Sequence, residues 1–188
     1  NTGLNFGELY TYTVYATNGD GIQTASIFDS KYTLAATPFV PTVVNPSSST
    51  LVVSITYGDA NSTSVQYAIQ ETGSGNYIQA DGSFGVSEYW ATTSTWSSKT
   101  ITGLSPNTTY IFKAKARNGE NTETSFGPSA SLYTYANMQG MPVLGSAATS
   151  SLSVAFDTNN NPGYTTYSIY NNTAGNYGAA DGLPTSIP

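Results

Sequence analysis

The sequence predicts an all-β protein built from antiparallel β-sandwiches in tandem, and three observations predict it. Short segments alternate apolar and polar residues with a period of two, clusters of turn residues separate these segments, and a pattern of about 100 residues repeats. No segment keeps a helical period of 3.6 over two turns. One sandwich domain has about 100 residues, so we expect the 188-residue chain to hold one whole unit and parts of two others.

The repeat is visible in short motifs that recur without a gap. The motifs Thr2-Gly3-Leu4, Tyr10 and Asn18-Gly19 return 100 positions later as Thr102-Gly103-Leu104, Tyr110 and Asn118-Gly119. Pro41, Leu51 and Val53 instead return at an offset of 101, as Pro142, Leu152 and Val154, so a loop has slipped by one residue. We therefore expect 1–36 to be the back part of a preceding unit, 37–136 a complete unit and 137–188 the front part of a following one. The chain is expected to be an excerpt or a processed product of a longer protein.

The strands of the complete unit follow from the alternation. In one segment the apolar residues Leu51, Val53 and Ile55 share a face opposite Ser54 and Thr56. In a second segment one face carries Tyr110, Phe112, Ala114 and Ala116, and the other carries Ile111, Lys113, Lys115 and Arg117. Each pattern predicts a strand with one buried face. Four clusters rich in Gly, Pro, Asn and Asp predict the turns, namely 45–47, 58–61, 105–107 and 118–119.

The amino-acid composition narrows the classes of function and of partner that the chain can have. Charged residues make up 9% of the chain, against about 25% in an average soluble domain, which favours a secreted or cell-surface protein. The chain has no Cys, so it has no disulfides and no thiolate chemistry, and five basic against eleven acidic residues make nucleic acid a poor partner. No apolar run is long enough for a membrane span.

A family resemblance rests on residues 101–119, which read ITGLSPNTTYIFKAKARNG. This stretch resembles the fibronectin type III signature, in which a Leu, a Pro-containing turn and a Tyr six residues after the Leu precede an alternating strand. The resemblance implies an immunoglobulin-like sandwich with a tyrosine corner at Leu104 and Tyr110, and an equivalent corner at Leu4 and Tyr10. It is closest to the tandem arrays of large bacterial surface or secreted proteins.

Two features depart from that family pattern. Many members carry a Trp in the second strand, but residues 51–57 have none, so we expect Trp90 or Trp96 to fill the core instead. The segment 81–98 is also longer than the family's usual connection. Both departures concern the details of core packing rather than the fold.

The candidate ligand contacts are four aromatic residues, Tyr77, Tyr89, Trp90 and Trp96. Exposed rings beside Asn and Asp could stack on sugars or form a protein contact patch. The alternative is structural, with at least one ring in the core and Tyr77 kept in every unit, since it recurs as Tyr177.

Catalytic, metal and cofactor sites are not expected. The chain has no His, which removes Ser-His-Asp arrangements and imidazole ligands. Two carboxylate pairs, Glu71 with Asp81 and Glu120 with Glu123, lie in loops or at strand ends of a fold without a built-in cleft. The recurring acids Asp20 and Glu120, and Asp81 and Asp181, give one carboxylate per loop, too few for calcium.

Three functions remain open. The first is a non-catalytic extracellular spacer in a surface, stalk or fibre protein, with neighbouring repeats as its partners. The second is a carbohydrate- or protein-binding accessory module of a secreted enzyme or adhesin. The third is a fibre in which identical chains meet head to tail by strand complementation. Twelve positions would stay unfilled between two chains in such a fibre, which favours an excerpt.

Overall fold

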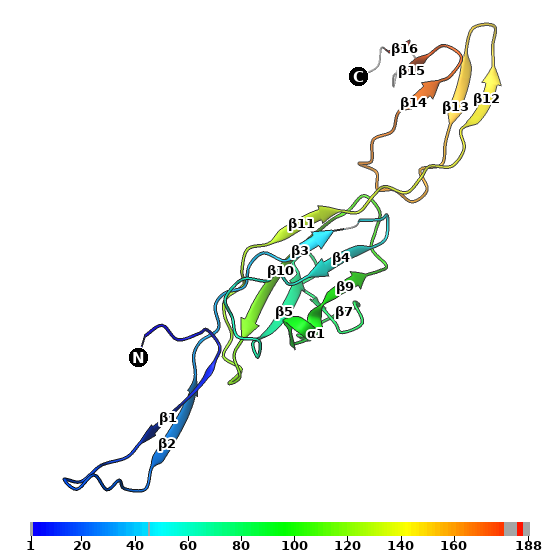
Figure 1. The fold of residues 1–188 in the computed structure, drawn as a ribbon. Coiled ribbons are helices and arrows are strands. Elements are labelled where there is room, and N and C mark those ends of the chain that lie inside the picture. The colour runs from blue at the N-terminus through cyan, green and yellow to red at the C-terminus, as the bar shows by residue number, and fades with distance from the viewer. Residues whose placement is uncertain (1, 45, 179–183, 186–188) are drawn as a thin grey trace. The chain divides into compact units, whose positions relative to one another are not determined.

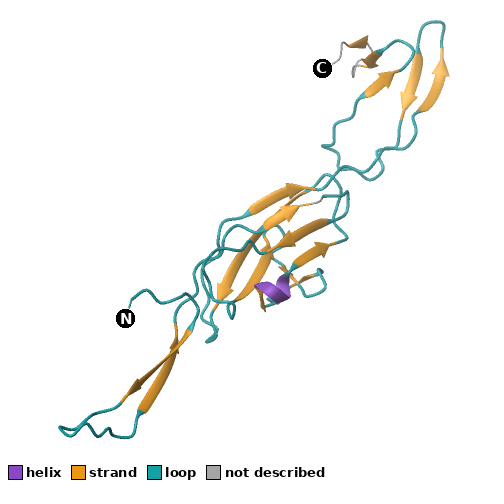
Figure 2. Cartoon of the chain, in the orientation of Figure 1, coloured by secondary structure: helices purple, strands orange, loops and turns teal. Residues whose placement is uncertain are grey.

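The computed structural model describes residues 2–44, 46–178 and 184–185. By contacts the chain divides into two compact units, 1–135 and 136–188. Every pairing between named strands is antiparallel, and the described residues contain one helical turn, α1 (Thr93–Trp96) (Figures 1 and 2). Within this described part, no helix has the length and apolar character needed to cross a membrane.

Residues 37–135 contain two sheets. The smaller sheet has the order β3-β4-β9 and the larger has β11-β10-β5-β6-β7, with β8 also paired to β5. The smaller sheet consists of β3 (Thr42–Val44), β4 (Leu51–Ser54) and β9 (Ser98–Ile101). The larger consists of β5 (Gln66–Glu71), β6 (Tyr77–Ile78), β7 (Phe84–Gly85), β8 (Ala91–Thr92), β10 (Thr109–Arg117) and β11 (Ala130–Tyr133). The predicted all-β sandwich is confirmed.

The core lies between these sheets and follows the predicted alternation. Leu51 and Val53 of β4 and Phe112 and Ala114 of β10 are fully buried, while Ile111, which comes directly before Phe112, is exposed. A strand places successive side chains on opposite faces, so an alternating sequence buries one face. Trp96 of α1 fills the remaining space and is also fully buried. Of the two tryptophans that could fill the core in the absence of a Trp in residues 51–57, it is therefore Trp96 that does so.

The hairpin of β1 (Leu9–Val14) and β2 (Ile27–Tyr32) belongs to the first compact unit. Tyr10 pairs with Lys31 in this hairpin, as Tyr110 pairs with Leu132 between β10 and β11. The predicted boundary between residues 36 and 37 falls inside this compact unit and stays a prediction.

The second compact unit has two small sheets. Their strands are β12 (Val143–Ala147) with β13 (Leu152–Ala155), and β14 (Ile169–Asn171) with β15 (Asn176–Gly178) and β16 (Pro184–Thr185). Leu144 pairs with Val154 as Val43 pairs with Val53 in the sandwich. Asp181, considered above for calcium, lies outside the described residues.

Local hydrogen bonds also recur 100 positions apart. The Asn18 Oδ1 accepts from the N–H groups of Asp20 and Ile22 at 3.0 and 2.9 Å. The Asn118 Oδ1 accepts from the N–H groups of the equivalent residues at the same two distances. A side chain that closes its own turn in this way is an Asx turn. The two Asn-Gly motifs therefore form the same local structure.

Candidate functional site on the outer face of the larger sheet

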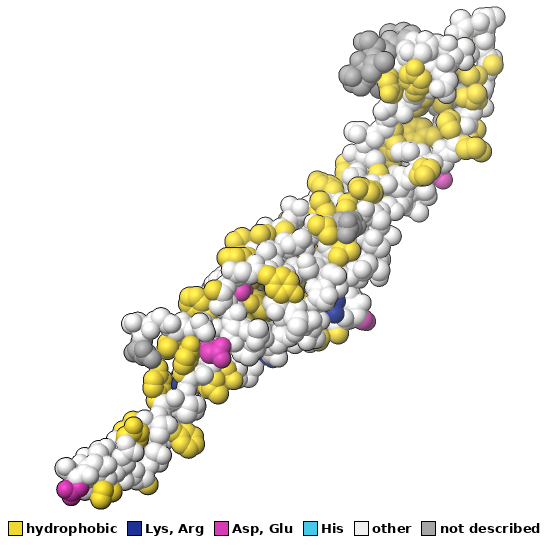
Figure 3. Space-filling model, viewed as in Figure 1, with side chains coloured by type: hydrophobic (Ala, Val, Ile, Leu, Met, Phe, Trp, Pro, Cys, Tyr) yellow, Lys and Arg dark blue, Asp and Glu magenta, His cyan; other side chains and the backbone are white. Residues whose placement is uncertain are grey.

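The side chains of Lys113, Lys115 and Arg117 lie on the face of β10 that points away from the core. Their neighbours Ala114 and Ala116 are fully buried, and the period of two sends the cations to the other side. In register, Lys115 lies opposite Ala68 and Arg117 opposite Gln66 on β5. This face therefore holds three of the five basic residues of the chain, and few cations appear on the side shown in Figure 3.

Lys115 is the centre of the site. Only 8% of the residue is exposed, and its Nζ donates to Glu88 Oε1 at 2.5 Å and to Glu123 Oε2 at 2.6 Å. Burial disfavours the charged ammonium, but the bonds to the two carboxylates outweigh it and raise the pKa of Lys115. Burial likewise opposes ionisation of Glu88, yet the bond from Lys115 keeps the pKa of Glu88 below its ordinary value. The three groups form a partly buried charged cluster.

Aromatic rings surround the ammonium group. The Lys115 Nζ lies 5.3, 5.5 and 5.8 Å from the ring centres of Trp90, Phe126 and Tyr77. The guanidinium carbon of Arg117 lies 4.5 Å from the Trp90 ring centre, within the range of a cation–π contact. Trp90, in the segment before β8, therefore lies over the outer face beside Lys115 and Arg117.

The Trp90 indole has a fixed orientation in this cluster. Its Nε1 donates to Glu88 Oε2 at 3.0 Å, while Arg117 Nε donates to Gln66 Oε1 at 2.8 Å. Both cations that touch the ring are therefore themselves anchored. The arrangement can hold the connection 81–98 on the sheet, and its aromatic edge is the part of this face that a ligand could touch.

The four predicted aromatic residues do not form one platform. Tyr77 and Trp90 lie on the outer face, but Trp96 is fully buried and its Nε1 donates to the carbonyl of Tyr67 at 2.7 Å. Tyr89 packs on Trp96 with ring centres 5.5 Å apart and planes at 71°. The prediction of Trp96 as a ligand contact is therefore wrong, because its ring is fully buried in the core of the sandwich.

Lys115, Glu88, Glu123 and Arg117 were not predicted as one site. The alternation of β10 placed the cations on one face, which was the available signal. The carboxylates come from segments 27 and 8 residues away from Lys115, and no local pattern specifies that meeting.

The two tyrosine positions make equivalent hydrogen bonds. The Tyr110 hydroxyl accepts from the Ser105 N–H at 2.9 Å, and the Tyr10 hydroxyl accepts from the Asn5 N–H at 2.9 Å. Leu104 is buried and Leu4 is half-buried. Each hydroxyl reaches back five residues along the chain, as a tyrosine corner does.

Glu71, Asp81 and Glu120, three of the carboxylates considered for catalysis or calcium, are bound by other groups. Glu71 accepts from the N–H groups of Gly73 and Ser74 at 2.8 and 2.7 Å. Burial opposes the charge of Glu71, but the bonds from Ser74 and Gly73 outweigh it and lower its pKa. Asp81 accepts from Ser83, and a salt bridge joins Glu120 to Lys31 at 2.9 Å. Within the described ranges, no three acidic residues gather as a metal site would need.

The strand order and the tyrosine corner define the class of this protein: residues 37–135 form a fibronectin type III-like β-sandwich. No protein-family profile matches the sequence. Receptor-type tyrosine-protein phosphatase eta of Gallus gallus is 33% identical over 133 residues, which cover 71% of this chain. The chain spans 9% of the length of that relative.

The solved structures similar to this chain include fibronectin type III domains. A segment of two such domains from chicken tenascin is 16% identical, with a TM-score of 0.44, and the match covers 67% of this chain and 65% of the segment. The domain of human fibronectin type III domain containing protein 3 is 15% identical, with a TM-score of 0.37, and the match covers 53% of this chain and 84% of that one. The fold assignment rests on the strand order and register given above.

Proposed function

We propose that this protein is a non-catalytic extracellular spacer in which sandwich units follow one another in tandem. The observation that carries the proposal is the recurrence of whole hydrogen-bonded turns 100 positions apart. The Ala16 N–H donates to Thr24 Oγ1 at 3.0 Å, and the Ala116 N–H donates to Thr124 Oγ1 at 3.0 Å. A chain that rebuilds the same local structure in each copy extends by repetition, which is the property a spacer needs.

The side-chain chemistry supports a structural role over catalysis. Lys115 is paired with both Glu88 and Glu123, and Glu71 is held by its own turn. A general acid or base needs a titratable group within reach of a substrate, whereas these groups face one another. The low charge of the surface supports an extracellular location.

Small-angle X-ray scattering on polypeptides with one to four copies of residues 37–136 tests the proposal. The nine residues of β10 rise about 3.4 Å each and span about 30 Å. We expect the maximum dimension to grow linearly, by about 30 to 40 Å per added copy, since each copy contributes at least one strand length. Growth with about the square root of copy number, as for flexibly linked units, would refute the spacer.

The second candidate, a binding module, is supported by the half-buried rings of Trp90 and Tyr77 on the outer face. A glycan array and a protein-binding screen with the 188-residue chain test it, with Trp90→Ala as the variant. Binding that Trp90→Ala abolishes, while Val86→Ala leaves it intact, would favour the binding module. Val86 is the control because it lies in the same connection and is 86% exposed.

A further inference from the structure

The loop between β4 and β5 holds the chain segment that precedes the sandwich. The Asn61 Oδ1 accepts from the Ala36 N–H at 2.7 Å, and the Asn61 Nδ2 donates to the Ala36 carbonyl at 3.0 Å. A primary amide can donate and accept at once, so it can bind both polar groups of one backbone residue. Asn61 thus pairs with Ala36 as a neighbouring strand would.

A network that reaches the core fixes the Asn61 side chain. Its Nδ2 also donates to Asp59 Oδ2 at 2.8 Å, and the same oxygen accepts from the Tyr67 hydroxyl at 2.8 Å. Only 2% of Tyr67 is exposed. Burial, with the bond to Asp59, raises the pKa of Tyr67, so its hydroxyl remains a donor. The contact with Ala36 is therefore anchored in the sandwich itself.

An equivalent contact occurs inside the second compact unit, 100 positions later for the asparagine and 101 positions later for the residue that it binds. The Asn161 Oδ1 accepts from the Asn137 N–H at 2.7 Å, and its Nδ2 donates to the Asn137 carbonyl at 2.9 Å. Asn61 and Asn161 are equivalent in the repeat, whereas Ala36 and Asn137 differ in side chain. Because both contacts use only backbone groups of the bound residue, the asparagine recognises the path of the chain and not its sequence.

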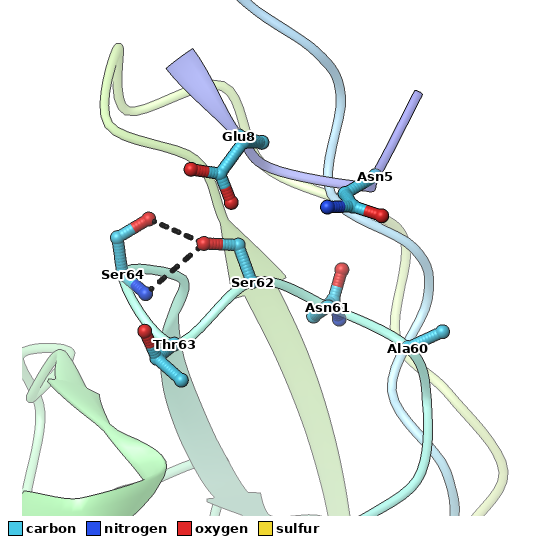
Figure 4. Close-up of a pocket in the computed structure, with 7 residues that line it drawn as sticks. All are labelled: Asn5, Glu8, Ala60, Asn61, Ser62, Thr63 and Ser64. Carbon is cyan, nitrogen blue, oxygen red and sulfur yellow. Dashed lines mark hydrogen bonds between the residues drawn. The ribbon is translucent and has the colours of Figure 1, made fainter. Parts of the chain in front are cut away.

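Further bonds hold the preceding segment beside Asn61. The Ser62 N–H donates to the Phe6 carbonyl at 2.9 Å, and Ser64 Oγ donates to the Gly7 carbonyl at 3.3 Å. In Figure 4, Asn5 and Glu8 of this segment line a shallow pocket together with residues 60–64 of the loop.

Two further features hold the preceding segment against the sandwich: a hydrogen bond from a second loop and a close packing of Gly7 against Val65. Asn118 Nδ2 donates to the Thr33 carbonyl at 3.1 Å. Gly7 has a φ of 65°, and a Cβ there would overlap the Val65 side chain. Glycine alone suits both the φ and the space.

We propose that Asn61 and Asn161 are joint clamps: each fixes the direction in which a sandwich unit continues from the segment before it, by binding that segment's backbone. The inference rests on the proposed spacer function, since a row of units has a defined reach only if its joints resist bending. The partner of each clamp is the backbone of the chain where it enters the unit, at Ala36 for Asn61 and at Asn137 for Asn161.

Amide hydrogen exchange by NMR on the 188-residue chain tests the clamps separately. In Asn61→Ala we expect the Ala36 amide to exchange about fivefold faster, the factor for one net hydrogen bond of about 1 kcal/mol, with the Asn137 amide unchanged. In Asn161→Ala we expect the reverse. Thr63→Ala is the matched control, because it changes the same loop and leaves Asn61 in place.

Unchanged exchange at Ala36 in Asn61→Ala and at Asn137 in Asn161→Ala would overturn the proposal. Should Asn61→Ala unfold the sandwich, Asn161→Ala provides the same test at the other clamp. A second measurement uses spin labels on Ser26→Cys and Thr102→Cys, since the chain has no other Cys. The distance distribution between the labels should broaden in Asn61→Ala and not in Thr63→Ala, and an unchanged width would overturn the joint role.

These results are independent of the scattering test of the spacer. Faster exchange combined with square-root growth of the polypeptides would retain the clamps and reject the spacer function. Linear growth combined with unchanged exchange would retain the spacer and reject the clamps.

Discussion

Replacing Trp96 by alanine removes the largest fully buried side chain of the sandwich. An aromatic side chain of this size buries about 150 to 250 Å², which at about 25 cal/mol per Å² corresponds to about 4 to 6 kcal/mol. Mutational series for buried Trp and Phe give about 3 to 5 kcal/mol. The lost bond from Trp96 to the Tyr67 carbonyl adds a polar group without a partner. We therefore expect Trp96→Ala to lower the free energy of unfolding by about 4 kcal/mol.

Urea unfolding followed by far-UV circular dichroism measures this loss. With an m value of about 2 kcal/mol/M, a loss of about 4 kcal/mol lowers the midpoint by about 2 M. Trp96→Phe should cost less, because a ring of similar shape stays in the core. If Trp96→Ala is unfolded without urea, Trp96→Phe supplies the measurable value.

Trp90→Ala is the matched control, since Trp90 lies on the outer face. Its indole makes cation–π contacts and one bond to Glu88, which together give about 1 to 2 kcal/mol. A Trp96→Ala loss below that of Trp90→Ala would refute the assignment of Trp96 to the core and reopen its role as a ligand contact.

Three further predictions concern the same sandwich. The folded pKa of Glu88 lies below its ordinary value of 4.5, so the stabilising effect of the Glu88 carboxylate is complete above pH 4.5 and is lost as the pH falls through the folded pKa. The free energy of unfolding, measured against pH in the acid range, should show this loss, and Lys115→Met should make the loss smaller. Gly127→Ala should destabilise the sandwich by about 1 to 3 kcal/mol in urea unfolding, because the new Cβ would overlap the backbone carbonyl of Pro38. Gly19→Ala, with open space around its Cβ, should be neutral, and equal effects of the two substitutions would contradict the packing argument. Tyr110→Phe keeps the ring and removes the hydroxyl bond of the corner, so we expect a loss of about 1 kcal/mol in thermal unfolding, and an unchanged midpoint would contradict it.

The core could be predicted from the sequence because its signal is local. Period-two alternation placed Leu51, Val53 and Phe112 on buried faces, and all three are fully buried. The choice between the two tryptophans could not be predicted in the same way. Trp90 and Trp96 are six residues apart in one long connection, and the path of that connection over the sheet edge decides which ring enters the core.

The site residues were harder to predict because their partners are distant. Asn61 lies 25 residues from Ala36, and Lys115 lies 27 from Glu88. A single sequence carries no local signature for such pairs. The available signal for the clamp is its recurrence, since Asn161 stands 100 positions after Asn61.

The two polar networks account for how a chain with 9% charged residues and no Cys can specify one sandwich. A disulfide can fix distant segments covalently, whereas here hydrogen bonds and ion pairs between side chains hold such segments together. Lys115 ties the connection 81–98 to the outer face of the larger sheet, and Asn61 ties the preceding segment to the end of the sandwich. Since each network joins segments more than 20 residues apart, each restricts the chain path where a disulfide otherwise would. The charged groups of Lys115, Glu88 and Glu123 therefore help to fix the path of the chain in the first network, and the neutral amide of Asn61 does so in the second.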